Sequence, residues 1–285
     1  MIRIVTDSTC EGPADLVAHP CFSFVPLYVM FGKEALRDRV DISTEGFWER
    51  LSREPTLPTT AQATPADFAG PFKRFTDQGD EVVACLISSK LSGTYESACI
   101  AQASLAGRPI SVVDSYNVSI GLGLLVEQAV AVAEAGATRA EIVSRLTALR
   151  DRIHVLFVPE TLEYLQKGGR IGRAQALAGT LLKLKPLLAI RDGEVGSVAR
   201  ARSKHRALES MLEYLGSEVP ERGPGLRLAV VHAGAEAEAA EVAKQMTAQF
   251  GSAHIFTDLL GPVIGVHAGP GTIGAAACVG ELAGK

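Results

Sequence analysis

Residues 81–107 read EVVACLISSKLSGTYESACIAQASLAG, a complete strand, turn and helix. The run EVVACLIS over 81–88 is apolar and rich in β-branched residues, which predicts a buried strand. A polar turn follows, and a helical pattern then runs from Thr94 until Gly107 ends it. A strand that leads directly into a helix is the repeating unit of a parallel sheet covered by helices.

The same unit recurs on both sides of this stretch. Strands are predicted over 2–7 and 109–115, and two consecutive helices over 121–153 follow the second of them. A β-hairpin over 24–40 interrupts the alternation, ahead of a helix that contains Trp48. Strand–helix alternation of this kind predicts three layers, with a parallel sheet between two layers of helices.

The pattern changes near residue 151, where hairpins mix with crossovers. A hairpin is predicted to turn at Asp192-Gly193, and such a mixture favours a mixed sheet. We therefore predict two domains: residues 1–150, a parallel α/β domain, and residues 151–285, a mixed-sheet α/β domain. The second domain is expected to contain strands over 153–159, 226–234 and 253–261, and helices over 161–184 (interrupted by glycines), 204–216 and 235–250, with a short helix at its end.

Composition excludes several classes of protein. A net charge of -4 argues against broad electrostatic binding to nucleic acid or to an anionic membrane. The five cysteines are widely spaced and form no C-x-x-C pair, so we expect reduced thiols, with neither a metal site nor a disulfide framework. The long uncharged run over 261–280 holds two prolines and several glycines, so it does not predict a membrane span. We expect a cytoplasmic protein without integral membrane contact.

Hydroxyl groups follow each predicted strand of the first domain. Residues 6–9 read TDST, residues 88–94 read SSKLSGT, and Asp114-Ser115 follow the third strand. The carboxyl ends of parallel strands meet at one edge of the sheet, where ligands sit against helix N-termini. Capping explains any single turn, because Ser, Thr and Asp are preferred N-caps. Three turns at one edge favour a binding site built from neutral hydroxyls.

Ser92 is also a candidate nucleophile, because it lies between a strand and a helix. The G-x-S-x-G sequence of the nucleophile elbow is absent, since Lys90 and Thr94 replace its glycines. His232 and His267 are candidate bases, but the sequence alone brings neither to Ser92. A serine hydrolase therefore stays open as an alternative, and no P-loop sequence occurs.

Residues 269–274, GPGTIG, match G-x-G-x-x-G by letter. A dinucleotide site also needs a further strand and an acidic residue about 20 positions on, and too few residues follow Gly274 to supply them. The glycines still allow an anion to approach the start of the predicted last helix, with His267 as a donor. A histidine satisfied within the core explains His267 equally well.

Seven motifs, taken in order along the chain, together resemble the DegV family of bacterial fatty-acid-binding proteins. The pair formed by SGTY and the distant L-x-Y-L-x-K-G-G-R-I-G is specific, and the resemblance covers essentially the whole chain. The motifs are TDST at 6–9, PTT-x-Q at 58–62, SSKLSGTY at 88–95, VDS at 113–115, LEYLQKGGRIG at 162–172, KP at 185–186 and GPVIGVHAGPGTIG at 261–274.

The resemblance implies a two-domain α/β carrier that encloses one long-chain fatty acid, with its carboxylate at the domain interface. It implies a subunit of a fatty acid kinase that is not itself an enzyme and needs no cofactor. A separate ATP-dependent kinase subunit would form the acyl phosphate. Thr60 and Ser92 would hydrogen-bond the carboxylate, with Arg170 and His267 nearby. The loop departs from the usual T-S-Q-P, because Ala61 and Ala63 remove a hydroxyl and the proline.

A basic cluster, ARARSKHR at 199–206, begins a predicted helix. Cations at a helix N-terminus oppose the helix dipole, so a purely structural role is mildly unfavourable. Arg200, Arg202 and Lys204 form either a solvated basic face or a docking patch, and the resemblance implies docking to the kinase. A small-molecule kinase and a lipid-sensing regulator without a kinase partner are further alternatives.

Overall fold

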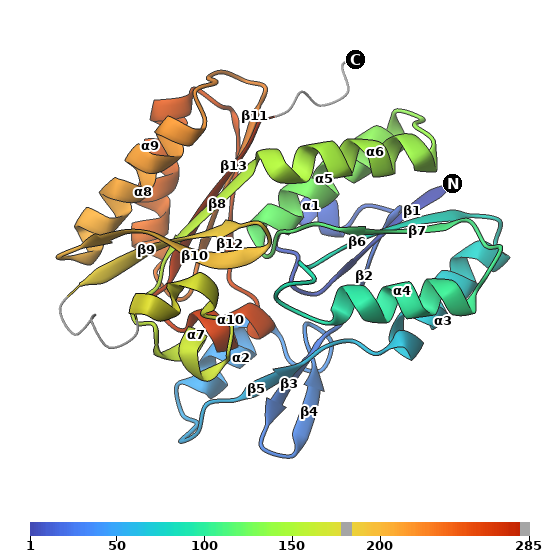
Figure 1. Cartoon of the computed structure of the whole chain (residues 1–285), viewed down its shortest axis with the longest axis horizontal. Coiled ribbons are helices and arrows are strands. Elements are labelled where there is room, and N and C mark those ends of the chain that lie inside the picture. Colours follow the sequence, from blue (N-terminus) through green and yellow to red (C-terminus); the bar gives the residue numbers. More distant parts are fainter. Residues whose placement is uncertain (178–183, 280–285) are drawn as a thin grey trace.

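A computed structural model of the protein describes residues 1–177 and 184–279. Within these residues, a four-stranded sheet and a six-stranded sheet lie on either side of helix α5 (Ile120–Glu134), as Figure 1 shows. Helix α5 contacts strands of both sheets and is apolar on nearly every face, as expected for a helix buried on all sides. The two sheets therefore share one central helix.

The first sheet is entirely parallel, in the order β2-β1-β6-β7. Alternate residues of β6 face opposite layers: Val82 and Ala84 pack with one set of helices, and Val83 packs with α5. This burial on both faces explains the uninterrupted apolar run, and the predicted three-layer parallel sheet is confirmed. The elements are β1 (Ile2–Asp7), β2 (Phe22–Val25), β6 (Glu81–Leu86) and β7 (Ile110–Asp114), with α3 (Pro65–Asp77) and α4 (Thr94–Ser104) on one face and α5 and α6 (Arg139–Leu149) on the other.

A small antiparallel sheet lies beside this core, in the order β4-β3-β5. The hairpin is shorter than predicted, because Phe24 and Val25 belong to β2 of the parallel sheet. Strand β5 (Thr59–Ala61) was not predicted, since it is only three residues long and pairs with a strand far upstream. The remaining elements here are α1 (Ala14–Val17), β3 (Tyr28–Phe31), β4 (Glu34–Arg37) and α2 (Thr44–Leu51).

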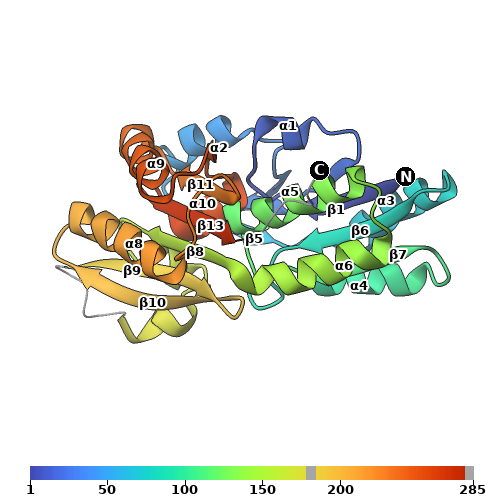
Figure 2. The same ribbon diagram turned by 90° about the horizontal axis from the view of Figure 1, so that it is seen from above.

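The second sheet is mixed, as predicted, in the order β10-β9-β8-β13-β11-β12. Only β11 and β12 pair in parallel among its described neighbours. Helices α8 and α9 cover the face away from α5, and Figures 1 and 2 both place them at the opposite end of the molecule from α3, α4 and α6. The elements are β8 (Ile153–Val158), β9 (Lys185–Arg191), β10 (Glu194–Ala201), α8 (Lys204–Glu218), β11 (Leu226–His232), α9 (Glu236–Phe250), β12 (His254–Leu259) and β13 (Ile273–Val279).

The predicted short helix at the end of the chain was wrong. Residues 273–279 form β13, the strand between β8 and β11, and the helix comes earlier as α10 (Pro262–Ala268). Ala275, Ala276 and Ala277 are fully buried in β13. Alanine favours helices in isolation, but here pairing with β8 on one edge and β11 on the other overrides that preference.

The predicted helix over 161–184 is interrupted at its glycines, as expected. It is divided into α7 (Glu163–Lys167) and a 3-10 helix, η2 (Gly172–Leu177), because Gly169 and Gly172 adopt positive φ values of 69° and 52°. Residues 178–183 of the predicted helix lie outside the described part of the chain. The predicted hairpin turn is confirmed, with φ of 51° at Asp192 and 80° at Gly193. The division of the chain at residue 150 stays a prediction.

Candidate functional site

A cavity of about 380 Å³ lies between the two sheets, at the N-terminal end of α5. Its volume falls within the range of about 300–1,000 Å³ that is usual for small-molecule sites. The lining is mainly apolar and comes from segments that are distant in the sequence. Examples are Ile87 after β6, Ile120 of α5, Val155 of β8, Ile190 of β9 and Val231 of β11.

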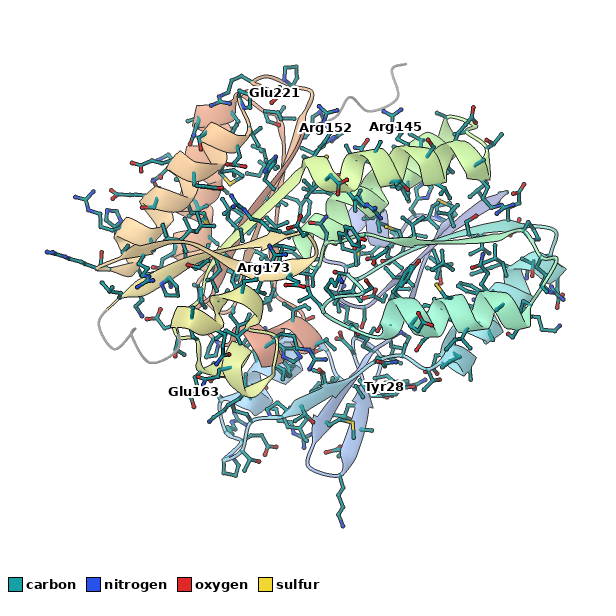
Figure 3. The ribbon with its side chains drawn as sticks, in the orientation of Figure 1. Tyr28, Arg145, Arg152, Glu163, Arg173 and Glu221 are labelled. Atoms are coloured by element: carbon teal, nitrogen blue, oxygen red, sulfur yellow. The ribbon has the colours of Figure 1, made fainter. Side chains whose placement is uncertain are left out.

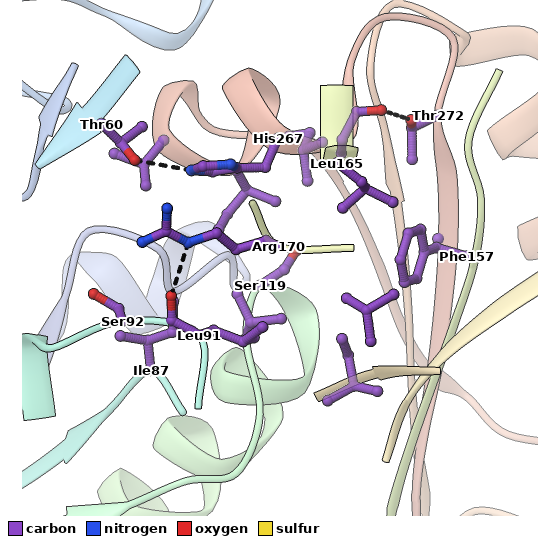
Figure 4. Close-up of a pocket in the computed structure, with 18 of the residues that line it drawn as sticks. Thr60, Ile87, Leu91, Ser92, Ser119, Phe157, Leu165, Arg170, His267 and Thr272 are labelled. Carbon is purple, nitrogen blue, oxygen red and sulfur yellow. Dashed lines mark hydrogen bonds between the residues drawn. The ribbon is translucent and has the colours of Figure 1, made fainter. Parts of the chain in front are cut away.

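The structure brings the four predicted ligand-binding residues together. Thr60, Ser92, Arg170 and His267 all line this cavity (Figure 4). Thr60 lies in β5, Ser92 in the turn before α4, Arg170 after α7 and His267 in α10. Figure 4 shows the four polar side chains grouped on one side of the cavity, with the Phe157 ring on the other. The cavity therefore has a polar region and an apolar region.

A hydrogen bond joins two of these residues across the fold. The Oγ1 atom of Thr60 lies 2.8 Å from Nε2 of His267. Burial and, to a smaller extent, the Arg170 guanidinium together lower the pKa of His267 to about 4, so the imidazole is neutral near pH 7. Nδ1 of His267 is buried without a partner among the described residues. A side chain on Gly168 would overlap Nδ1, so glycine is needed there for the ring to pack.

Ser92 closes the turn that begins α4. Its Oγ lies 2.9 Å from Oγ1 of Thr94 and accepts the Thr94 backbone N–H at 3.3 Å. The pair needed for a serine hydrolase is not formed in the part of the chain that the structure describes. His267 contacts Thr60, and no histidine among the described residues hydrogen-bonds to Ser92.

Arg170 is exposed and held by two backbone carbonyls. Its Nε donates to the Leu91 carbonyl at 3.1 Å, and one of its terminal nitrogens donates to the Gly168 carbonyl at 2.8 Å. Across residues 1–177 and 184–279, no carboxylate forms an ion pair with Arg170. Its positive charge is therefore available to an anion in the cavity.

The interpretation of three converging hydroxyl turns was wrong for two of the turns. Asp7 accepts hydrogen bonds from Thr9 and from the Ile87 backbone, and Ser88 donates to the Gly193 carbonyl at 2.8 Å. Asp114 accepts from the backbone amides of two nearby residues. These groups hold the loops together, and of the hydroxyl-bearing residues in the three turns only Ser92 lines the cavity.

Three further polar residues that line the cavity were missed: Ser119, Gln62 and Thr272, whose Oγ1 donates to the Ala268 carbonyl at 2.8 Å. Ser119 lines the cavity with a φ of 57° and only 6% exposure, and its hydroxyl has no hydrogen-bond partner among the described residues. Gln62 donates to the Gly93 carbonyl at 3.3 Å and to Oγ of Ser97 at 3.1 Å. Gln62 thus ties the strand that carries Thr60 to the start of α4. The sequence carries no pattern that indicates any of these roles.

Charged side chains surround the segment between α7 and β10. Arg173 in η2 pairs with Asp192 at 3.2 Å and with Glu194 at 3.3 Å, and Figure 3 shows it beside the start of β10. These contacts fasten η2, which follows Arg170, to the β9–β10 turn. The backbone beside Arg170 is thereby connected to the second sheet.

The three predicted docking residues lie outside the cavity lining. Arg200 and Arg202 are exposed at the end of β10, and no ion pair to either is found among the described residues. Lys204 differs from them, because it pairs with Glu238 at 2.6 Å and approaches Glu160 at 3.8 Å. The free positive charge of the cluster therefore belongs to the two arginines.

The described residues contain neither a metal-binding cluster nor a membrane-spanning helix. No group of three or more His, Cys, Asp or Glu side chains is arranged to hold a metal ion. No helix there is both long and apolar enough to cross a bilayer.

The fold and the site define a two-sheet α/β protein with an internal, mainly apolar cavity that is polar on one side. A family model described as "Uncharacterised protein, DegV family" matches residues 1–279. A DegV domain-containing protein of Deinococcus radiodurans is 37% identical over 280 residues, covering 96% of this chain and 97% of that one. The chain belongs to the DegV family.

Solved structures agree with this assignment. A DegV family protein from Thermus thermophilus, described by its fatty acid binding, superimposes with a TM-score of 0.91 at 35% identity, over 98% of this chain and 99% of that one. A stearic-acid-binding protein from Eubacterium ventriosum gives a TM-score of 0.88 at 28% identity, over 98% of each chain. DegV family members are thus fatty-acid-binding proteins.

Proposed function

We propose that the protein binds one long-chain fatty acid in this cavity and presents its carboxylate to a partner kinase. The partner would be an ATP-dependent subunit in the cytoplasm, and the product would be an acyl phosphate. The observation that carries the proposal is the mainly apolar cavity with Thr60, Ser92, Arg170 and His267 grouped on one side. The fatty-acid-binding structures of related chains support the ligand class.

The division of labour between head and tail follows from the energetics of burial. About fourteen methylenes of palmitate at ~0.8 kcal/mol each contribute ~11 kcal/mol. A hydrogen bond to a charged group contributes only ~1.5–3 kcal/mol. The apolar walls therefore supply most of the affinity, and the polar residues orient the carboxylate.

The polar residues suit a carboxylate that is held but not chemically attacked. The neutral imidazole of His267, the hydroxyls of Thr60 and Ser92 and the guanidinium of Arg170 can all donate hydrogen bonds to a carboxylate. Arg170 supplies the one positive charge of these four groups. Among the described residues no base hydrogen-bonds to Ser92, which favours an anchoring role over a nucleophilic one. We therefore infer a carrier, with the phosphoryl transfer performed by the partner.

The exposed arginines are the proposed contact with the kinase. Glu194 and Ala201 are the ends of β10, and at a rise of ~3.3 Å per residue this strand is roughly 23 Å long. Arg200 and Arg202 thus lie far along the strand from the turn next to Ser88. A partner that docks on these arginines would approach the carboxylate from outside the apolar walls that enclose the acyl chain.

Mass spectrometry tests the ligand directly. Purified protein is weighed under native conditions, denatured, and its extract is analysed for lipids. We expect about one equivalent of a long-chain fatty acid per chain. Protein that is empty, and stays empty after incubation with palmitic and oleic acids, would contradict the proposal. If the extract instead contains one equivalent of a different lipid class, the cavity is still the lipid-binding site, but the proposed ligand class is wrong.

A further inference from the structure

Helix α10 connects the second half of the chain to the cavity. It carries His267, and its residues Val263, Ile264 and Ala268 line the cavity. The helix has only seven residues, too few to be stable alone. Contacts from other elements must therefore set its position, and with it the position of the imidazole.

Glu11 makes the contact at the start of this helix. It lies in the loop after β1, is fully buried, and its Oε1 accepts the backbone N–H of Gly261 at 3.0 Å. Gly261 is the N-cap of α10 and has no side chain to cap the helix itself. The residue that follows, Pro262, has no N–H to offer. Glu11 is thus an external partner for the backbone where α10 begins.

Arg39 holds Glu11 in place. Its Nη2 donates to Oε1 of Glu11 at 3.3 Å, and its Nη1 donates to the Cys10 carbonyl at 2.9 Å. Arg39 adopts a φ of 61°, which is uncommon for a residue with a side chain. A Cβ on Gly261 would lie 2.9 Å from Oε1 of Glu11 and 3.0 Å from Nη2 of Arg39. The three groups are therefore closely packed.

This pair is costly to bury. Burial raises the pKa of Glu11, although Arg39 opposes the rise. A buried ion pair is often no more stabilising than an apolar pair of the same volume, so stability alone does not explain it. The neighbourhood instead connects to the cavity: Ser119, whose buried hydroxyl lines it, is among the groups that lower the pKa of Glu11.

We propose that Glu11, held by Arg39, is a positioning residue that fixes the start of α10 and so sets His267 against Thr60. This inference rests on the proposed function only where it extends to the head group of the ligand. Trp48 assists at the same end, because its Nε1 donates to the Leu260 carbonyl at 2.8 Å. Glu11 itself does not line the cavity.

The test compares variants by the NMR signals of the His267 ring, recorded first without lipid. Glu11→Ala removes the acceptor for Gly261, whereas Glu11→Gln keeps an acceptor oxygen and removes the charge. Gly261→Ala disturbs the same contact from the side of α10, because its Cβ would crowd the Glu11 carboxyl. It replaces Glu11→Ala in the comparison if that variant does not fold. Asp80→Asn is the matched control, because Asp80 is 7% exposed and paired with Arg3 at 2.7 Å in the same half of the chain.

Glu11→Ala and Gly261→Ala are expected to shift the His267 ring signals, with Glu11→Gln closer to wild type. Asp80→Asn should lower the melting temperature and leave these signals unmoved. A second spectrum, of bound palmitate labelled with ¹³C at the carboxyl, should shift in Glu11→Ala, with less than about tenfold loss of affinity because the tail dominates binding.

Two results would overturn the inference. One is a set of Glu11 and Gly261 variants that lose stability while the ring signals stay at their wild-type positions. The other is a shift of equal size in Asp80→Asn, which would indicate a general loosening. Wild-type protein that binds no palmitate would contradict the proposed function instead, and the lipid-free ring signals would still decide the role of Glu11.

Discussion

Replacing Ser92 by alanine separates the two parts of the proposed binding energy. The hydroxyl closes a turn through Thr94, and α4 begins immediately after that turn with its backbone hydrogen bonds intact. Loss of the turn contact should therefore lower the free energy of unfolding by only ~0.5–1.5 kcal/mol. Loss of a hydrogen bond to a carboxylate should weaken palmitate binding by ~1.5–3 kcal/mol, about 10- to 150-fold.

The assay is equilibrium binding of palmitate and of hexadecanol, which has the same chain without the carboxylate. Ser92→Ala should weaken palmitate binding far more than hexadecanol binding. Ser89→Ala is the control, since Ser89 lies exposed in the same turn and outside the cavity. An equal loss for both ligands would show that Ser92 acts only through the turn. Labelling of Ser92 by a fluorophosphonate, with ester hydrolysis that Ser92→Ala abolishes, would favour the hydrolase.

Two other predictions concern pH and docking. The pKa of His267 is lowered from 6.5 to about 4, so the folded state binds fewer protons than the unfolded state between these values. The free energy of unfolding should therefore fall by about 3 kcal/mol as pH drops from 6.5 to 4. In urea unfolding, His267→Gln should lack this pH-dependent loss of stability. If stability falls equally with pH in the wild type and in His267→Gln, the prediction is wrong. Arg202→Glu should keep its lipid but reduce acyl phosphate formation by a partner kinase about tenfold at low salt. Lys244→Glu is the control, because Lys244 is 79% exposed on α9, and it should not reduce acyl phosphate formation. If Arg202→Glu lost its lipid but still supported the kinase, the docking assignment would be wrong.

Most of the fold could be predicted where local pattern and tertiary environment agree. The run 81–107 became β6 and α4 because its apolar residues are buried on both faces of the sheet and its polar turn lies at the strand end. The capping residue Thr64 and the N1 proline Pro65 also occur as their types suggest. Residues 273–279 were mispredicted because alanine-rich segments favour helices unless two neighbouring strands pair with them.

The site was less accessible to sequence reasoning than the fold. Thr60, Ser92, Arg170 and His267 were selected through a family resemblance, and their spacing alone does not bring them together. Hydroxyls at strand ends were a poor guide, since Thr9 and Ser115 hydrogen-bond within their own loops and Ser88 hydrogen-bonds to the β9–β10 turn. The cavity itself depends on how side chains from both sheets pack around α5, which no local pattern records.

The position of β13 has a consequence for the order of folding. Its two partners, β8 and β11, begin at residues 153 and 226, so the middle of the second sheet stays empty until residues 273–279 have been synthesised. Helix α10, with His267, enters only shortly before. Pairing of strands that are far apart in the sequence is slow, because the entropy of loop closure is lost before the stabilising contacts form. The nascent protein therefore has no complete cavity until the last strand has closed the sheet.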